Sequence, residues 1–320
     1  MQDYYSHPQG IQVDPSRCLR LRFNKSECRQ CLESCPVNAL QIQQSIKIDS
    51  QVCSQCLLCL SACPTGCFEA RDFDFYLKIA KIKKIHSPVI ACSLKPDLPA
   101  HEKFPCFGFL SEEHIITLTV ALERRLQVNL TACADCRNGF IVPILQNRLM
   151  NLAAKTSLAI LERIKLVEDK SDLSYEEVSY DRRNFFKTLK NLSFQGARDF
   201  YDQISPTAQK GKPYVAKNLP EKRKLLNRSL RIMPDRVSKE VLKNYYYHAT
   251  LHESCNSCWA CVAMCPTGAL KRSQKDGAGR LLFNSSLCTG CGLCENFCSL
   301  NALRLHPGFS GAHPFEFTPR

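Results

Sequence analysis

The sequence predicts an α+β protein in which two small cysteine-rich modules flank an α/β unit and a helical linker. Three observations support this prediction: cysteine runs repeat near both ends of the chain, strand and helix patterns alternate between them, and a cysteine-free basic stretch follows. The predicted boundaries are 1–75 and 248–320 for the cysteine-rich modules, 76–170 for the α/β unit and 171–247 for the linker.

The composition restricts the class of protein. The chain has 320 residues, 44% hydrophobic and 23% charged, which is typical of a folded chain and not of a disordered one. It has no apolar run near the roughly 18 residues of a membrane-spanning helix, and its start lacks the features of a signal peptide. We therefore expect a cytoplasmic location, in which the 21 cysteines are more suited to metal binding than to disulfides.

The cysteines form four runs, grouped as two pairs. Three runs have the complete pattern C-x2-C-x2-C-x3-C and the first is nearly complete. Three thiolates at this interval can wrap three corners of a cubic cluster, while backbone N–H groups point at its sulfides. The fourth corner must be closed from elsewhere, which explains the pairing, with 17 residues between Cys35 and Cys53 and 22 between Cys265 and Cys288. A zinc ribbon, the alternative, requires only C-x2-C pairs.

The residues around these runs carry a family resemblance. Residues 28–70 and 253–305 each resemble a bacterial two-cluster ferredoxin domain, including Pro64-Thr65-Gly66 and Asn301-Ala302-Leu303 beside the runs. The resemblance implies four [4Fe-4S] clusters whose ligands cross between the two runs of a pair. It assigns three complete ligand sets: Cys53, Cys56, Cys59 and Cys35; Cys255, Cys258, Cys261 and Cys298; and Cys288, Cys291, Cys294 and Cys265.

The remaining set, Cys28, Cys31 and Cys63, departs from the family pattern. Lys25 occupies the regular position of the first ligand, and an ammonium group is a poor ligand for iron. Cys18, ten residues before Cys28, is the predicted substitute. A three-iron cluster or a non-protein ligand is the alternative. Cys67 lies near this set but is interpreted as a small buried thiol and is left out of it.

The segment between the cysteine-rich modules reads as a strand, helix and strand. Residues 88–92 form an apolar strand, Ser111 can cap a helix with apolar residues at helical spacing, and residues 128–130 form a second strand. A further helix through Leu145 and Leu149 leads to a strand at 164–167. A crossover connection brings the carboxyl ends of its strands to one edge of a sheet. We expect four thiols to meet there: Cys92, Cys106, Cys133 and Cys136.

This layout resembles the delta-subunit family of methyl-viologen-reducing hydrogenases. The resemblance implies a [2Fe-2S] cluster at the four central cysteines. Zinc is the alternative metal, and four buried thiols that act as small hydrophobic residues are the alternative without a metal.

The linker contains no cysteine and is basic in its second half. A helix beginning at Asn184 is expected to use an apolar stripe for packing, formed by Phe185, Phe186, Leu189, Leu192, Phe200, Tyr201 and Ile204. Residues 217–243 contain nine basic and three acidic side chains, which suggests nucleic acid as one candidate partner. Five oxidised clusters would add about −10 to the formal charge of +13, so much of the positive charge is expected to offset the clusters or to meet an acidic partner.

The motifs favour electron transfer over catalysis. The sequence contains no radical-SAM triplet, no phosphate-binding loop and no dinucleotide fingerprint, and it offers no catalytic residues. The predicted function is that of a polyferredoxin that relays electrons between partners of an anaerobic oxidoreductase, such as hydrogenase, formate dehydrogenase or heterodisulfide-reductase-like subunits. Attachment to a membrane complex would then occur through a partner. The alternatives are an enzyme with chemistry at the Cys18 cluster or the central cysteines, and a nucleic-acid-binding protein.

Overall fold

The computed structural model describes residues 10–177, 217–273, 279–309, 311 and 313–320. The described residues up to Tyr175 and those from Lys217 onward form one compact unit, while Glu176 and Glu177 belong to a second unit. The helix predicted to begin at Asn184 lies outside the described residues. Helices and strands are mixed through the compact unit, which confirms the predicted α+β class.

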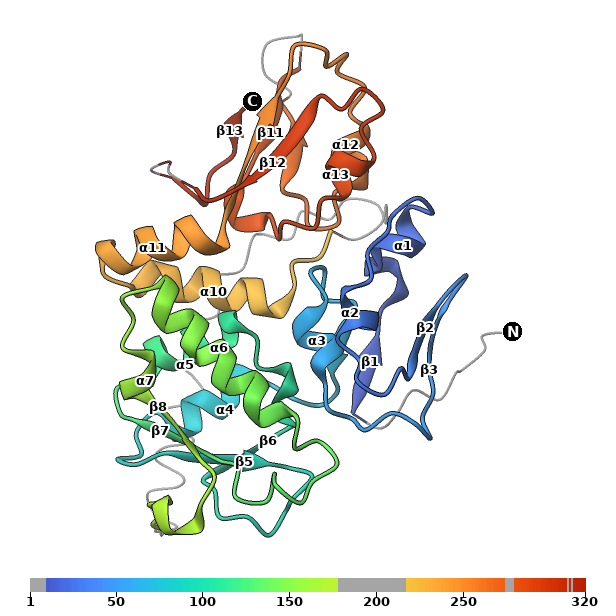
Figure 1. Ribbon diagram of the computed structural model, residues 1–320. Coiled ribbons are helices and arrows are strands. Elements are labelled where there is room, and N and C mark those ends of the chain that lie inside the picture. The colour runs from blue at the N-terminus through green and yellow to red at the C-terminus, as the bar shows by residue number, and fades with distance from the viewer. Residues whose placement is uncertain (1–9, 178–216, 274–278, 310, 312) are drawn as a thin grey trace. The chain divides into compact units, whose positions relative to one another are not determined.

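The N-terminal module is built from two short antiparallel strand pairs (Figure 1). Strand β1 (Ile11–Val13) pairs with β4 (Phe68–Ala70), and β2 (Leu40–Ile42) pairs with β3 (Ile46–Ile48). The connections contain the single turn η1 (Pro15–Arg17) and the short helices α1 (Leu19–Arg22), α2 (Gln30–Glu33) and α3 (Leu58–Ala62). Elements of three to five residues make few internal hydrogen bonds, so the cysteine loops between them are a large part of the fold.

The C-terminal module repeats this plan. Strand β9 (Tyr247–Leu251) pairs with β12 (Leu303–Pro307), and β10 (Leu270–Arg272) pairs with β11 (Leu281–Phe283), which also pairs with β13 (Thr318–Pro319). The connections contain α12 (Ala260–Met264), the turn η5 (Ser285–Leu287) and α13 (Leu293–Asn296). In both modules the outer strand pair brackets the cysteine runs and the inner hairpin separates them. The two modules are therefore topological equivalents, with β1 corresponding to β9.

The central unit is a four-stranded parallel sheet with strand order β6-β5-β7-β8 (Figure 1). Its strands are β5 (Val89–Cys92), β6 (Glu102–Phe104), β7 (Leu126–Asn129) and β8 (Ile164–Val167). Its helices and turns are α4 (Phe75–Ile82), η2 (Phe107–Phe109), α5 (Glu112–Ala121), α6 (Ile141–Lys155), α7 (Ile160–Arg163) and η3 (Lys170–Asp172). The three predicted strands and both predicted helices are present. Strand β6 was not predicted, because its sequence Glu-Lys-Phe gives no apolar signal.

The described part of the predicted linker contains two helices that pack closely on the rest of the chain. They are α10 (Glu221–Ile232) and α11 (Asp235–Tyr245). Leu225 and Leu226 of α10 are fully buried, and Ser229 Oγ donates a hydrogen bond of 3.1 Å to Thr117 Oγ1 of α5. Burial of two leucines contributes roughly 3–6 kcal/mol of hydrophobic stabilisation. This segment therefore acts as a packed element between the central unit and the C-terminal module.

Several basic side chains of this segment are involved in packing. The guanidinium groups of Arg223, Arg228 and Arg231 lie 5.0, 4.1 and 4.4 Å from the ring centroids of Tyr246, Tyr76 and Phe315. Lys222 Nζ donates a hydrogen bond of 2.7 Å to the carbonyl oxygen of Ser61. These contacts occupy charges that a nucleic-acid surface would need to expose. Among the described residues, no helix has the length and apolar character needed to cross a membrane.

Candidate metal centres

The three complete cysteine runs share one backbone conformation. In each run, the residues directly before and after the middle cysteine have positive φ angles. These pairs are Gln55 (56°) and Leu57 (64°), Ser257 (57°) and Trp259 (60°), and Gly290 (66°) and Gly292 (71°). Left-handed residues at this interval curl the backbone into a concave loop that can turn N–H groups toward an anion. Side chains other than glycine are strained there, which is consistent with a demanding binding loop.

The closing cysteine of each run also sits in a repeated turn. The residue three positions later has a positive φ angle in all four cases: Asn38 (51°), Gly66 (65°), Gly268 (76°) and Asn301 (51°). The next N–H then donates to the cysteine sulfur, from Ala39 to Cys35 (3.3 Å), Cys67 to Cys63 (3.2 Å) and Ala302 to Cys298 (3.3 Å). Hydrogen bonds of this kind favour the thiolate form and tune the potential of a bound cluster. The donor set therefore suits iron–sulfur clusters.

Site A is the irregular site predicted at the N-terminal end. Cys18, Cys28, Cys31 and Cys63 line one cavity, together with Cys67. The pKa of the Cys31 thiol is raised to about 12, mainly by burial, with contributions from the negative charges of Cys63, Cys18 and Cys28. These four cysteines therefore lie close together around the cavity. An iron–sulfur cluster would relieve this repulsion by supplying positive charge between them.

Cys18 occupies the same topological position as Cys255 in the C-terminal module. The N–H of Asp14, after β1, donates to Cys67 O (2.8 Å), and the N–H of His252, after β9, donates to Ala302 O (2.8 Å). The cysteine that follows then closes a turn, with hydrogen bonds of 3.0 Å from Cys18 N and 3.1 Å from Cys255 N. Cys18 is therefore in the regular first-ligand position. Lys25 is an exposed residue of an insertion, so the register that placed it at a ligand position was wrong.

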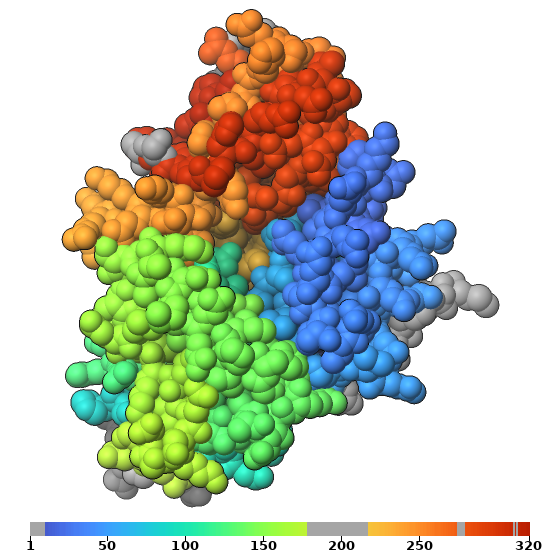
Figure 2. Space-filling view, in the orientation of Figure 1, coloured from blue at the N-terminus to red at the C-terminus, as the bar shows by residue number. Residues whose placement is uncertain are grey.

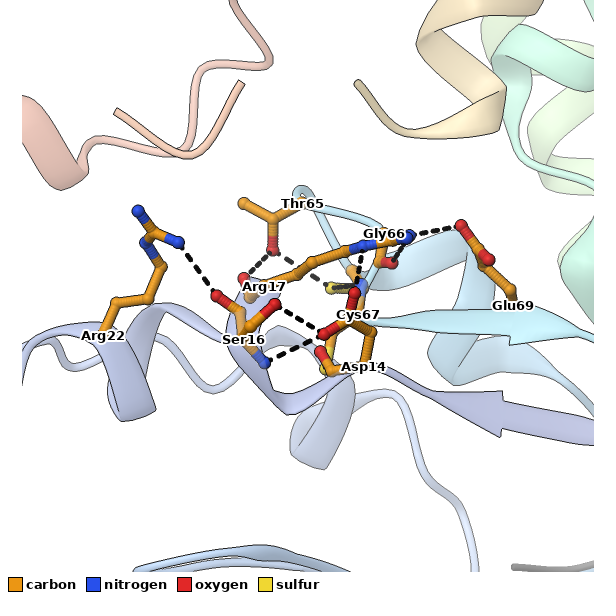
Figure 3. Close-up of polar contacts among 9 residues, drawn as sticks. Asp14, Ser16, Arg17, Arg22, Thr65, Gly66, Cys67 and Glu69 are labelled. Carbon is orange, nitrogen blue, oxygen red and sulfur yellow. Dashed lines mark hydrogen bonds and ion pairs between the residues drawn. The ribbon is translucent and has the colours of Figure 1, made fainter. Parts of the chain in front are cut away.

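Arg17 attaches the Cys18 turn to the Cys63 turn (Figure 3). Its side chain donates to Gly66 O (2.9 Å) and forms ion pairs with Asp14 (2.8 Å) and with Glu69. Thr65 Oγ1 donates in turn to Arg17 O (2.7 Å). The sequence analysis did not identify Arg17. The signal was present, because an arginine directly before a ligand cysteine can pair with nearby acidic residues, here Asp14 after β1 and Glu69 in β4.

Cys67 is a fifth thiol beside site A. It stands four residues after Cys63, where the equivalent residues in the other three turns are Ala39, Ala269 and Ala302. Its side chain is buried, and its sulfur lies 3.2 Å from Asp14 O. A hydrogen bond with Cys67 holds the pKa of Cys18 down to about 6, while the same bond raises the pKa of Cys67. The pair therefore favours a Cys18 thiolate beside a neutral Cys67.

Site B takes its thiols from both runs of the N-terminal module. Burial raises the pKa of Cys59 well above its usual range, and the charges of Cys56, Cys53 and Cys35 add to this effect. Cys59 belongs to α3, whereas Cys35 closes the other run after α2. The structure thus brings together the four cysteines of one predicted ligand set. The charge of Cys31 also acts on Cys59, so sites A and B are neighbours.

Sites C and D show the same crossing in the C-terminal module. At site C, burial raises the pKa of Cys261 to about 11, and the charges of Cys255, Cys258 and Cys298 contribute. At site D, burial raises the pKa of Cys294, and the charges of Cys288, Cys291 and Cys265 contribute. At each site, three cysteines of one run therefore lie near one cysteine of the other run. Cys258 of site C is exposed.

Comparison with known proteins agrees with this geometry. Residues 26–67 and 254–302 match the family described as the 4Fe-4S dicluster domain. Two separate segments of the chain therefore match the same family. Their recurrence confirms the predicted resemblance to two-cluster ferredoxins. The match begins at residue 26, so Cys18 lies outside it.

One curated relative resembles part of this chain. It is the pyruvate synthase subunit PorD of Methanocaldococcus jannaschii, which is 36% identical over 52 residues. The aligned region makes up 16% of this chain and 57% of that protein. The chain thus spans a little more than half the length of this relative.

The central cysteines lie at one edge of the parallel sheet. Cys92 ends β5, Cys106 follows β6, and Cys133 and Cys136 follow β7. A hydrogen bond with Cys106 lowers the pKa of Cys92 to about 7. Burial raises the pKa of Cys133 to about 11, with contributions from the charges of Cys92 and Cys136. The four predicted thiols are therefore neighbours, and a set of four cysteines suits a [2Fe-2S] cluster.

The central site directly abuts site B of the N-terminal dicluster domain. Asn138 Nδ2, a buried group, donates to the carbonyl oxygen of Ser54 (2.9 Å) and lies 3.6 Å from Cys106 Sγ. A Cβ atom added to Gly108 would lie 2.0 Å from the carbonyl oxygen of Cys56. Neither residue was identified from the sequence. Only the packing of η2 on the site B loop reveals why glycine stands at position 108.

The thiol groups at each site are too far apart to bind one metal ion. Among the described residues, no three His, Cys, Asp or Glu side chains converge closely enough to hold one ion. All 21 cysteines are free thiols.

Proposed function

We propose that this chain is an iron–sulfur electron-transfer protein with four [4Fe-4S] clusters and a fifth cluster at the central cysteines. Sites A to D are assigned to Cys18, Cys28, Cys31 and Cys63; Cys35, Cys53, Cys56 and Cys59; Cys255, Cys258, Cys261 and Cys298; and Cys265, Cys288, Cys291 and Cys294. The carrying observation is that each of the four sites draws its thiols from both halves of its module. Clusters held this way exchange single electrons without bond formation to a substrate.

The partners are redox proteins of an oxidoreductase complex. The likeness to a pyruvate synthase subunit supports a role as a subunit of, or donor to, such a complex. Hydrogenase, formate dehydrogenase and heterodisulfide-reductase-like subunits are the partner classes that we propose. The central site, with its four cysteines at a sheet edge, supports the same role because it abuts site B.

Anaerobic metal analysis of the purified full chain tests this proposal. We expect about 16–18 iron atoms and matching acid-labile sulfide, the higher value if the central site holds two irons. About 16 irons together with one zinc would assign zinc to the central site. A protein with stoichiometric zinc and only about four irons or fewer would contradict the polyferredoxin function.

A further inference from the structure

The ligand loop of site A is longer than its counterparts. In the three complete runs, two residues separate the first and second cysteines, whereas residues 19–27 separate Cys18 from Cys28. Since Cys18 is the topological equivalent of Cys255, these residues are an insertion within the ligand loop. We call residues 19–27 the site A insertion. It contains α1.

The site A insertion contacts the C-terminal dicluster domain. The rings of Phe23 and Phe297 meet edge to face, with centroids 4.9 Å apart and planes at 70°. Arg22 Nη2 donates to Met264 O (3.4 Å), while its Nη1 donates to Ser16 O (2.9 Å). Phe297 directly precedes Cys298, and Met264 directly precedes Cys265. The insertion therefore reaches residues adjacent to ligands of sites C and D.

Ligands of the two dicluster domains are electrostatic neighbours at this contact. The pKa of the Cys291 thiol at site D is raised to about 11, mainly by burial, with smaller contributions from the charges of Cys265 and of Cys28 at site A. Figure 2 draws the N-terminal module in blue and the C-terminal module in orange and red. The hydrogen bond from Arg22 to Met264, the residue directly before the site D ligand Cys265, places the site A insertion beside the ligand loop of site D.

We propose that the site A insertion docks the two dicluster domains so that site D exchanges electrons directly with site A. The five sites then form a single path in the order C, D, A, B and central site. This inference rests on the proposed function, because it requires a cluster at each site. In each step one electron leaves a reduced cluster and enters its oxidised neighbour, and no bond forms or breaks.

The two ends of the path differ in exposure. At one end, the site C ligand Cys258 is exposed, whereas the ligands of site D include the buried Cys265, Cys288 and Cys294. At the other end, the central site is connected to site B through Asn138 and the close approach at Gly108. The redox partner of the C-terminal domain is therefore expected to dock at the loop around Cys258.

The test compares a double variant, Arg22→Ala with Phe23→Ala, with Lys25→Ala as the matched control. Lys25 lies in the same insertion and is exposed. Both variants should retain the full iron and sulfide content. A failure of the proposed function would appear as missing iron, whereas a failure of this inference would appear only in the spectra. In the fully reduced protein, electron paramagnetic resonance should show the magnetic interaction between sites A and D in the control and its loss in the double variant. Equal spectra in the two variants would overturn the proposal.

A second measurement follows the electron itself. A ruthenium photosensitiser attached at Glu253→Cys, an exposed position beside site C, injects an electron on a flash. In the Lys25→Ala variant we expect fast reduction of the N-terminal and central clusters after the flash. In the double variant we expect this fast reduction to be lost. If the double variant loses iron, Phe297→Ala replaces it, because this residue forms the other half of the contact. Equally fast electron transfer in the double variant would refute the single path. Absence of electron transfer in the labelled protein without other substitutions would also refute it.

Discussion

Cys18 and Cys67 show how one thiol becomes a ligand while its neighbour does not. Both lie at the cavity of site A, but the hydrogen bond between them lowers the pKa of Cys18 and raises that of Cys67. Only a thiolate binds iron strongly, so we expect Cys18 to be the ligand and not Cys67. Its position after β1, equivalent to that of Cys255 after β9, supplies the matching geometry.

We predict that Cys18→Ala converts site A to a three-iron cluster. The loss of one thiolate leaves one corner of the cube without a protein ligand. Electron paramagnetic resonance of the oxidised protein should reveal a new three-iron signal, while the other sites keep their spectra. The matched Cys67→Ala variant should retain the four-iron cluster. An unchanged spectrum in Cys18→Ala, with conversion only when Cys67 is also replaced, would show that Cys67 can take over as ligand.

The only tryptophan of the chain reports on site C. Trp259 lies between the ligands Cys258 and Cys261, and its ring contacts the guanidinium of Arg272 at 4.9 Å. Because an iron–sulfur cluster absorbs in the range of tryptophan emission, the holoprotein should have quenched fluorescence. Replacing both Cys258 and Cys261 with alanine should remove this cluster and raise the emission, whereas the same double replacement of Cys56 and Cys59 at site B should leave it nearly unchanged. Equal emission from these two variants would contradict the placement of a cluster at site C.

At the scale of elements, the turn η2 connects the central sheet to a cluster loop. It follows Cys106, contains Gly108 and leads to α5, which is capped by Ser111. Arg148 of α6 holds this turn from the other side, donating to Gly108 O (3.1 Å) and Leu110 O (2.6 Å). The turn is therefore fixed between α6 and site B, with no free space for a side chain at position 108.

We predict that Gly108→Ala disturbs two metal sites at once. The added methyl group would meet the carbonyl oxygen of Cys56, and a backbone atom cannot move aside as a flexible side chain can. The resulting shift should cost about 1–3 kcal/mol and alter the spectra of both site B and the central site. Met150→Ala, at an exposed position of α6, is the control. Full iron content and unchanged spectra in Gly108→Ala would contradict the packing.

At the scale of the molecule, stability is unevenly distributed. One apolar core joins the N-terminal module, the parallel sheet and helices α10 and α11, whereas the C-terminal module has a separate, smaller core. Three ligands, Cys265, Cys288 and Cys294, belong to that smaller core. A domain of this size buries too little apolar surface to be stable without its clusters.

We predict that removal of iron unfolds the C-terminal module before the central unit. Without clusters, the cysteine runs of sites C and D lose the iron–sulfur bonds that join them, and the small core loses its support. Hydrogen exchange of the iron-depleted protein should show rapid exchange at β9–β12, while β5 and β7 remain protected. The holoprotein is the control. Simultaneous loss of protection in all these strands would show that the parts unfold together.

The sequence by itself determined the chemistry of the clusters and the elements of the central sheet. Cysteine spacing acts over a few residues, so the runs ending at Cys63, Cys265 and Cys298 predict both the loop shape and the ligand sets. The strands that end near Cys92 and before Cys133 were also predictable, because each is a short apolar run that can be recognised without knowing its contacts. One further signal was available: Asp14, Asp49 and Asn284 each stand four residues before Cys18, Cys53 and Cys288.

Only the tertiary structure decided how distant segments meet. It placed Cys18 in the regular ligand position, brought Gly108 and Asn138 against the loop of site B, and set Phe23 against Phe297. The sequence could not predict these contacts. The insertion between Cys18 and Cys28 breaks the regular cysteine spacing, and no periodic pattern indicates which loops pack together. Ligand spacing is a property of a short loop, whereas the order of the sites depends on packing between segments far apart in the chain.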